Sequence, residues 1–475
     1  MAPPEEMPRP FACGLLSVAV PGAGQICAGR RRRGLLIIAL ALSAGVLASW
    51  YAWREEAALA ESVVQLDVLL ALLVANALAL ILRFVFVVDA YGIAARERRR
   101  AGGSSSPIVM GVSLVALLCL TVAPHALFGW ITYVTYDTID TVFADEEPRD
   151  VLSPEVLAAG ALAAGGSAPV LAGDRAIVAE EADRKRRGGW TTILLIGGDA
   201  GYLREGLRAD TLIAVSIQSG TGRAAVFSVP RNLERVPLVG AAGRAYGRFP
   251  DLINALYRFA HARPDLFRGG RDPGATALKQ TVSNLLGIPI HYYVLVDLRG
   301  FVEVVDALGG VRLVATDTVD DLTSPAFPGE PWTEIHVEEG DVVRLDGRHT
   351  LAYARSRWAS SDYSRMLRQR CVLAAMATRI DSMRVVRSLS RLSSAAKRFV
   401  STDIPRKRLP KLVRLLRGIS PYRTMAVSFS PPTYSVVEPD VAQFRSTVRR
   451  LQHFKLQRLR EEDGLRAVAG LCPQP

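Results

Sequence analysis

The chain has 475 residues, a formal net charge of +12, 49% hydrophobic residues and a mean hydropathy of +0.19. These values exclude a disordered chain, a collagen and a disulfide-dense mini-protein. A positive hydropathy combined with a basic balance indicates a chain that is part membrane segment and part water-soluble domain. Only six of the 58 basic residues are lysine. This arginine bias is typical of a GC-rich genome, so a single arginine is weak evidence of function.

Apolar runs near the N-terminus predict a membrane region over residues 1–134. Spans are expected at about 34–53, 68–88 and 108–134, each long enough to cross a bilayer. Residues 11–29 are also apolar, but the turn sequence PGAGQ within them favours a re-entrant or interfacial segment. A cleavable signal peptide is not expected, because the apolar segments recur.

The arginine clusters beside these spans predict their orientation. Arginines occupy positions 30–33, before the first span, and positions 96 and 98–100, between the second and third. The positive-inside rule places both clusters in the cytoplasm. We therefore expect a multi-pass cell-membrane protein whose residues after about 135 are extracytoplasmic. Arg83, within the second span, is expected to pair with Asp89 or to reach the interface.

Strand and helix patterns alternate in the rest of the chain and predict an α/β domain. Residues 135–190 are expected to form a connector, with helical hints at 154–164. The domain itself is expected at 191–400, with 401–475 as an extension that packs on it. Strands are predicted at 192–196, 211–217, 224–229, 291–296 and 311–314, and helices at 252–262, 274–286, 298–307 and 364–380.

Charged side chains stand at the ends of the first three strands. Asp199 ends the first, Arg208 and Asp210 lead into the second, and Arg231 follows the third. Neighbouring strand ends meet at one edge of a sheet, where open α/β folds bind ligands. Two carboxylates there suit Mg²⁺, which also takes phosphate oxygens. The alternative, which we favour for either aspartate alone, is a side chain that caps the following turn.

A second group of candidate residues lies between positions 353 and 369. In an extended segment Arg355 and Arg357 point to the same face. On a helix, Arg365, Arg368 and Gln369 share a face. Guanidinium groups bind phosphate through paired hydrogen bonds, so converging arginines would neutralise a pyrophosphate. The alternative is a solvated basic face. Residues 351–420 carry 17 basic and 3 acidic residues.

The five cysteines give limited information. Cys13, Cys27 and Cys119 lie in apolar stretches and are interpreted as small hydrophobic residues. A disulfide between Cys371 and Cys472 is possible but does not follow from the sequence. The chain has no CxxC pair, no GxxxxGK[ST] phosphate loop and no GxSxG nucleophile motif.

An ordered set of segments over about residues 191–380 resembles the LytR-CpsA-Psr family. The segments read ILLIGGD, LRADTLIAVSIQ, VFSVPR, LINALYRFA, GIPIHYYVLVDLRGFVEVVDALGGV and LDGRHTLAYARSRWASSDYSRMLRQ. Members of that family are membrane-anchored enzymes that transfer a glycopolymer from a polyprenyl-pyrophosphate carrier onto peptidoglycan, with Mg²⁺ at the pyrophosphate. The resemblance implies such a phosphotransferase in cell-wall assembly, with pyrophosphatase as a side activity. It also implies a central mixed β-sheet flanked by helices, with an apolar tunnel for the lipid.

The resemblance further implies roles for single residues. Asp199 and Asp210 match the metal-associated acids, either is a candidate general base, and Arg231 joins them as a catalytic residue. The pyrophosphate-binding set comprises Arg208, Arg231, Arg355, Arg357, Arg365 and Gln369. The chain departs from the family pattern at Asn232, where aspartate is usual, and at Leu252, where lysine is usual. Three expected spans replace the usual single anchor. These departures put the acceptor side in doubt.

Three other functions are consistent with parts of the sequence. A non-catalytic membrane sensor or regulator, resembling a transcriptional attenuator, would bind the lipid-linked polymer without transferring it. A transporter is disfavoured because three spans are few and no broken repeats are visible. Nucleic-acid binding is disfavoured by the expected outside location, despite the charge.

Overall fold

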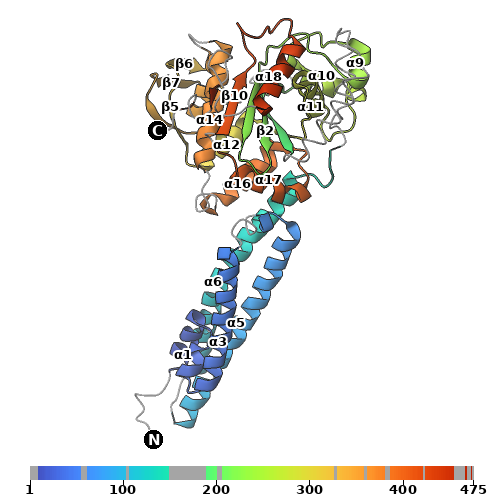
Figure 1. The fold of residues 1–475 in the computed structure, drawn as a ribbon. Coiled ribbons are helices and arrows are strands. Elements are labelled where there is room, and N and C mark those ends of the chain that lie inside the picture. Colours follow the sequence, from blue (N-terminus) through green and yellow to red (C-terminus); the bar gives the residue numbers. More distant parts are fainter. Residues whose placement is uncertain are drawn as a thin grey trace. The chain divides into compact units, whose positions relative to one another are not determined.

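The computed structural model describes residues 9–54, 61–102, 106–148, 189–199, 206–325, 329–357, 361–379, 386–420, 423–453, 466–467 and 472. The chain divides into two compact units, Met1–Asp137 and Thr138–Pro475. Figure 1 colours the first unit blue to cyan and the second mostly green to red. The helical hints at 154–164 lie outside the described residues.

The first unit consists of helices. The short helices α1 (Pro10–Ala19) and α2 (Ala23–Cys27) precede the long helices α3 (Arg31–Arg54), α5 (Leu66–Arg100) and α6 (Pro107–Val142). Among the described residues, α5 and α6 are long and apolar enough to cross a membrane, and only 6% and 11% of their apolar windows are buried. Core helices of a soluble protein would be mostly buried. The span expected at 34–53 falls within α3 and is not confirmed.

The segment 11–29 folds as two short helices joined by a tight turn. A Cβ atom on Gly24 would lie 2.1 Å from the carbonyl oxygen of Cys13, which explains a glycine in the PGAGQ turn. Cys13 and Cys27 form a disulfide, so their interpretation as separate small hydrophobic residues was wrong. Arg83 donates to the carbonyl of Val18.

Of the two alternatives for Arg83, the pairing with Asp89 is contradicted. Asp89 pairs instead with Arg33, with 3.2 Å between Nη2 and Oδ1. The buried Gln25 donates to the other carboxylate oxygen of Asp89, also at 3.2 Å. The carboxylate therefore already has two partners, and the Arg83 guanidinium satisfies a backbone carbonyl instead.

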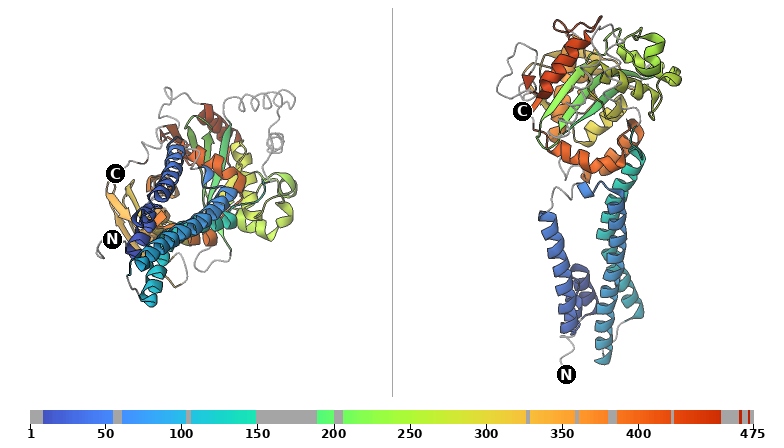
Figure 2. Two further views of the ribbon diagram at one scale, coloured as in Figure 1. Left: turned by 90° about the horizontal axis from the view of Figure 1, so that it is seen from below. Right: turned by 45° about the vertical axis from the view of Figure 1, so that its right-hand side comes forward.

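The second unit is built on a mixed sheet with the strand order β11-β10-β3-β2-β1-β4-β9. β1, β2 and β3 are antiparallel neighbours, whereas β4 is parallel to β1 and β10 is parallel to β3. Figure 2 (right) shows these strands side by side. The strands are β1 (Trp190–Asp199), β2 (Arg208–Gln218), β3 (Ala224–Val229), β4 (Tyr292–Asp297), β9 (Val400–Thr402), β10 (Thr424–Ser428) and β11 (Arg466–Ala467).

The two faces of this sheet have different surroundings. Successive side chains of a strand point to opposite faces, so Leu194 and Ile196 of β1 enter the main core, as do Tyr293 and Leu295 of β4. Helices α10 (Leu256–Ala262), α11 (Pro273–Leu286) and α18 (Val441–His453) contribute to that core. Figure 1 shows α10 and α11 on one side of the sheet and α14 on the other.

The other face is covered by a second layer with its own core. This layer contains α12 (Leu298–Ala307), α13 (Gly347–Arg355) and α14 (Asp362–Arg379), with the small sheets β5–β8 and β6–β7. Val305, Val311, Tyr353 and Val372 are among its buried residues. The small strands are β5 (Val311–Val314), β6 (Val319–Thr323), β7 (Thr333–Val337) and β8 (Val342–Leu345).

Residues beyond 400 are part of the sheet and its core. β10 pairs with β3, and Met425, Phe429 and Phe444 belong to the main core. α16 (Leu389–Phe399) and α17 (Leu409–Arg417) lie on either side of β9 in the sequence. The remaining short helices are α9 (Gly240–Tyr246), η2 (Ile253–Ala255), η3 (Pro264–Leu266) and η4 (Arg406–Arg408).

The predicted strands and helices of the domain are confirmed. The helix expected at 252–262 begins as the 3₁₀ turn η2 and continues as α10, and the helix expected from Ser364 begins at Asp362. The prediction missed α13, β6 to β10 and α16 to α18.

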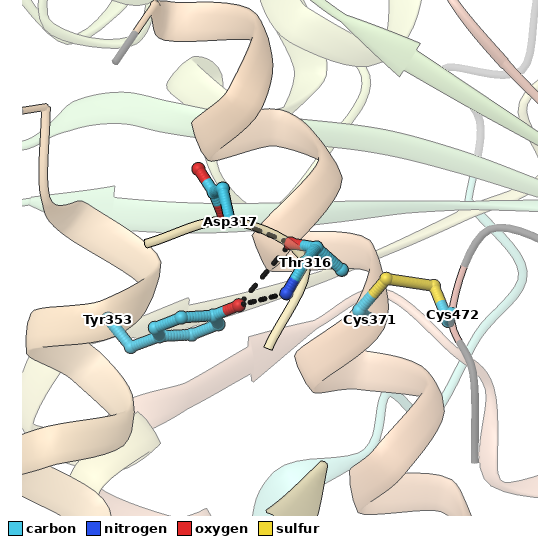
Figure 3. The surroundings of a disulfide bond; sticks show 5 residues. All are labelled: Thr316, Asp317, Tyr353, Cys371 and Cys472. Atoms are coloured by element: carbon cyan, nitrogen blue, oxygen red, sulfur yellow. Dashed lines mark hydrogen bonds between the residues drawn. A yellow bond between two sulfur atoms is a disulfide. The ribbon is translucent and has the colours of Figure 1, made fainter. Parts of the chain in front are cut away.

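A disulfide joins Cys371 of α14 to Cys472. Figure 3 shows it near Tyr353, whose hydroxyl accepts from the backbone N–H of Thr316 at 3.0 Å. Cys371 and Cys472 are both buried. Because 101 residues separate the two cysteines, the bond closes a long loop and restricts the unfolded chain strongly.

We expect Cys371→Ser to lower the free energy of unfolding by about 4 kcal/mol, because loop-closure entropy of that order is lost. The melting temperature of the full chain in detergent, measured by near-ultraviolet circular dichroism, checks this. Cys119→Ser is the matched control, since Cys119 is a free, exposed cysteine. Equal melting temperatures for the two variants would contradict the assignment.

Candidate functional site

A cavity of about 620 Å³ lies between the sheet and the layer of α12, α13 and α14. This volume falls in the range of small-molecule sites. Leu195, Gly197 and Asp199 of β1 share the face that lines it, because they alternate with the core residues Leu194 and Ile196. Much of the lining is apolar and includes Leu195, Val294, Phe301, Val304, Leu373 and Met376.

Two aspartates line the cavity where β1 ends and β2 begins. Asp199 is buried there, and Asp210 lies on the neighbouring strand. The pairing of the two strands shifts register between Gly197 and Gly198. A Cβ atom on Gly197 would lie 2.8 Å from Cβ of Thr211, so only glycine lets the strands approach here. The ends of β1 and β2 therefore bring the two predicted aspartates to one cavity.

Arg231 and Arg365 share a network with two carboxylates. Nη1 of Arg231 lies 2.9 Å from Oδ1 of Asp210, and its Nε lies 3.3 Å from Oδ2 of Asp362. Nη1 of Arg365 lies 3.7 Å from Oδ1 of Asp362. Asp362, which is 131 residues from Arg231 in the chain, was not predicted as a site residue. Asp362 lies in the first turn of α14, where the helix dipole stabilises a carboxylate. An acidic residue at the start of the predicted helix was therefore the available signal.

Burial acts differently on the two guanidinium groups. Burial, together with the charge of Arg231, lowers the pKa of Arg365 to about 10 although Asp362 acts in the opposite direction. Burial also opposes the charged form of Arg231, but Asp210 and Asp362 outweigh it and the pKa of Arg231 is raised. Both groups are protonated at neutral pH. Nε of Arg365 is buried without a hydrogen-bond partner among the described residues.

Arg355 and Arg357 both line the cavity, but they are not in one extended segment. Asp346 is the N-cap of α13, which begins at Gly347 and has Arg355 as its last residue. Its Nη2 lies 3.6 Å from Oδ2 of Asp199. Ser356 follows with extended backbone and places Arg357 beyond the helix end.

Gln369 also lines the cavity and donates to the carbonyl of Ala354 at 3.3 Å. Arg208 is exposed and does not line the cavity. Arg368 is fully buried and is directed elsewhere: its Nε donates to the carbonyl of Tyr353 at 2.8 Å, and it pairs with Asp317. Arg368 therefore does not share a ligand site with Arg365, although the two residues were predicted to lie on one helical face.

The two departures from the family pattern lie beside these residues. Asn254, two positions after Leu252, directs Nδ2 towards Oδ1 of Asp210 at 3.4 Å. The Oδ1 atoms of Asn232 and Asn254 are buried and have no hydrogen-bond partner among the described residues. Asn232 and Asn254 do not line the cavity, so these two acceptors are buried beside it.

The described residues contain no cluster of three metal-ligating side chains. Asp199 and Asp210 nevertheless suit Mg²⁺, which binds through one or two carboxylates together with phosphate oxygens and water. Each of these carboxylates is now held by an arginine. A divalent cation on the carboxylates would release Arg231 and Arg355 to bind anionic oxygens, so the residues present fit the ion when phosphate is bound with it.

Comparison with known proteins identifies a family. The model of the LytR_cpsA_psr family matches residues 171–439. The curated relatives include the polyisoprenyl-teichoic acid–peptidoglycan teichoic acid transferase TagU of Halalkalibacterium halodurans, 30% identical over 215 residues, or 45% of this chain and 60% of the relative. The corresponding TagV of Bacillus subtilis is 27% identical over 52% of this chain and 59% of its own length. The chain therefore matches about three fifths of these relatives.

Solved structures and a further curated relative also align with the chain. The crystal structure of B. subtilis TagV aligns with a TM-score of 0.42 and 26% identity, over 56% of this chain and 96% of that one. A structure of TagT bound to LIIa-WTA aligns with a TM-score of 0.39 and 20% identity, over 55% and 89% of the two chains. The biofilm regulatory protein A of Streptococcus mutans is a further curated relative, 26% identical over 49% of this chain and 55% of its own.

We expect Arg357→Gln and Arg365→Gln each to weaken the binding of inorganic pyrophosphate by about 10- to 100-fold, because each removes charge-assisted hydrogen bonds from the cavity. Isothermal titration calorimetry on the full chain with Mg²⁺ measures this. Arg208→Gln is the matched control and should bind as the wild type does. A loss with Arg208→Gln alone would place the anion outside the cavity.

Proposed function

Because the chain belongs to the LytR-CpsA-Psr family, whose model matches more than half of it, we propose that it transfers a glycopolymer from a polyprenyl-pyrophosphate carrier onto peptidoglycan. The curated relatives named as teichoic acid transferases support the reaction class. The identity of the glycopolymer is not part of the proposal.

One observation carries the proposal: a single cavity combines an apolar lining with a group of arginines. The apolar part suits a polyprenyl chain, and Arg231, Arg355, Arg357 and Arg365 suit its pyrophosphate. The buried, unpartnered Nε of Arg365 fits an anion that completes its hydrogen bonds. A ligand with a long apolar tail and a multiply charged head would satisfy both parts at once.

In the proposed reaction, a hydroxyl of the acceptor sugar attacks the phosphorus that carries the glycopolymer. The bond from this phosphorus to the bridging oxygen breaks, and polyprenyl phosphate leaves. Arg231 and Arg365 lie where they would neutralise the negative charge that accumulates on the phosphate oxygens. Asp199 or Asp210 accepts the hydroxyl proton.

Mg²⁺ is the proposed cofactor, held by Asp199 and Asp210. When bound, it supplies Lewis-acid stabilisation of the phosphate oxygens. The buried position of Asp199 and the neighbouring position of Asp210 on β2 support this assignment.

The proposed location is the cell membrane, with α3 as a third span and the second unit outside the cytoplasm. The arginine clusters at 30–33 and 96–100 support this orientation through the positive-inside rule. In that position the cavity would be on the same side as peptidoglycan.

A non-catalytic sensor of lipid-linked polymer is the second candidate. The relative named biofilm regulatory protein A supports a regulatory role for some similar chains. Both candidates bind the lipid pyrophosphate, so only chemistry separates them. The full chain in detergent, given a lipid-linked glycopolymer, peptidoglycan and Mg²⁺, should release polyprenyl phosphate and label the peptidoglycan. Binding without either hydrolysis or transfer would favour the sensor.

We expect Arg231→Ala and Arg357→Ala each to reduce transfer at least about 100-fold, since removal of one preorganised charge partner in an active site has effects of this order. Labelled glycopolymer bound to peptidoglycan is the readout. Arg312→Ala, at an exposed position on β5 that does not line the cavity, is the control. Full activity of either site variant would refute its assignment to the pyrophosphate.

Removal of divalent cations should abolish transfer by the wild-type chain and Mg²⁺ should restore it, because Asp199 and Asp210 would lose the ion that links them to phosphate. Transfer is measured after EDTA treatment and after Mg²⁺ is added back. Asp210→Asn should need more Mg²⁺ for half-maximal activity. Undiminished transfer in EDTA would exclude the proposed cofactor.

A further inference from the structure

α16 and α17 present a strongly basic surface that the proposed reaction does not use. Residues 386–420 contain ten lysines and arginines and a single carboxylate, Asp403. Asp403 is buried and pairs with Lys279, whereas Asp140, Asp145 and Glu147 from the preceding segment pair with Arg406 and Arg408, which are therefore left out of the surface defined here. The exposed side chains of this surface, called the α16–α17 basic face below, are Arg391, Arg398, Lys407, Lys411, Arg414 and Arg417.

α17 owes this surface to an amphipathic sequence. Leu409, Leu412 and Leu415 recur at three-residue spacing and are buried against the domain. Lys411 and Arg414 recur at the same spacing on the exposed side. Leu416 is 51% exposed among these basic residues. Basic side chains with an exposed leucine between them are typical of helices that lie in a membrane interface.

The segment that leaves the expected membrane span contacts this region of the domain. Thr138 donates to Ser393 of α16 at 2.6 Å, and Arg406 pairs with Asp140 at 2.7 Å and Asp145 at 2.8 Å. The backbone N–H of Ala144 donates to the carbonyl of Ile404 at 2.9 Å. The chain is therefore fixed to α16 and η4 as soon as it enters the second unit.

The number of residues between the end of the predicted span and Thr138 gives the distance from the membrane to the contacts described above. The apolar run predicted to cross the bilayer ends at about residue 134, and Thr138 follows four residues later in the same helix. At 1.5 Å per residue this is about 6 Å. Side chains beside Ser393 and Arg406 would therefore lie within reach of the lipid head groups, whose layer on each side of the hydrocarbon is several ångströms thick.

We propose that the α16–α17 basic face binds the anionic phospholipid head groups of the membrane in which α5 and α6 are anchored. The inference rests on the proposed membrane anchoring and does not depend on the transferase activity. An acidic wall polymer would satisfy the same charges, but the contact of α16 and η4 with the end of α6 favours lipid. Basic residues near such a surface gain about fivefold each in association with anionic lipid.

The test compares the full chain in nanodiscs of phosphatidylcholine with the full chain in nanodiscs in which about a third of the lipid is phosphatidylglycerol. Hydrogen–deuterium exchange of residues 407–417 is the readout. We expect exchange to slow several-fold in the anionic discs, and this protection to disappear at about 1 M salt, where charges are screened within about 3 Å.

The triple variant Arg391→Gln, Lys407→Gln and Lys411→Gln should exchange equally fast in both lipids. Arg244→Gln, Arg268→Gln and Arg312→Gln together are the matched control, with the same change in charge at exposed positions on α9, before α11 and on β5. Figure 1 shows α9 at the opposite end of the second unit from α17. Unchanged exchange in β1 confirms that each variant is folded.

Three outcomes would overturn the proposal. The first is that residues 407–417 of the wild type exchange equally fast in both lipids. The second is that the control variant loses this protection as fully as the triple variant does. The third is that soluble poly(glycerol phosphate) protects the same residues in neutral discs, which would make an acidic polymer the partner. Failure of the transferase proposal gives a different result: Arg357→Ala would keep full transfer activity while the lipid-dependent protection stayed intact.

Discussion

The arrangement of the candidate site depends on the cost of burying like charges together. Burial, together with the nearby charge of Arg231, lowers the pKa of Arg365, and burial also opposes the charged form of Arg231. Asp362 contacts both guanidinium groups, and Asp210 contacts Arg231. Without these carboxylates the two arginines could not remain close and charged in a partly buried cavity. The fold meets this constraint by bringing β2, the end of β3 and the start of α14 to one place.

The same constraint explains why the site suits a ligand that brings charge of both signs. The carboxylates that stabilise the arginines also take up their N–H donors. An anion that arrives without a cation would therefore compete with Asp199 and Asp210 for the same donors. A phosphate group accompanied by a divalent cation would exchange partners instead, with the cation on the carboxylates and the phosphate on the arginines. Specificity for a metal-bound pyrophosphate would then follow from the resting ion pairs themselves.

The sequence predicted the parts of the fold with strong local signals. The strands at 192–196, 211–217 and 224–229 alternate or are continuously apolar, and their polar ends located Asp199, Asp210 and Arg231 correctly at one edge. Asp362 was missed because its partner Arg231 is far away in the chain, and distance in sequence carries no contact information. The helix that ends at Arg355 was missed although Asp346, its N-cap, was a visible signal. β10 is only five residues long, and nothing local distinguishes it as the neighbour of β3.

The place of β10 in the sheet has a consequence for biosynthesis. β10 lies parallel to β3, which precedes it by about 200 residues, and it supplies part of the core beneath α18. While the chain is being made, the edge of β3 stays unpaired until residues 424–428 have appeared, and an unpaired strand edge is prone to aggregation. A chain shortened before β10 would thus lack one side of its sheet even though all the arginines and aspartates of the site were present.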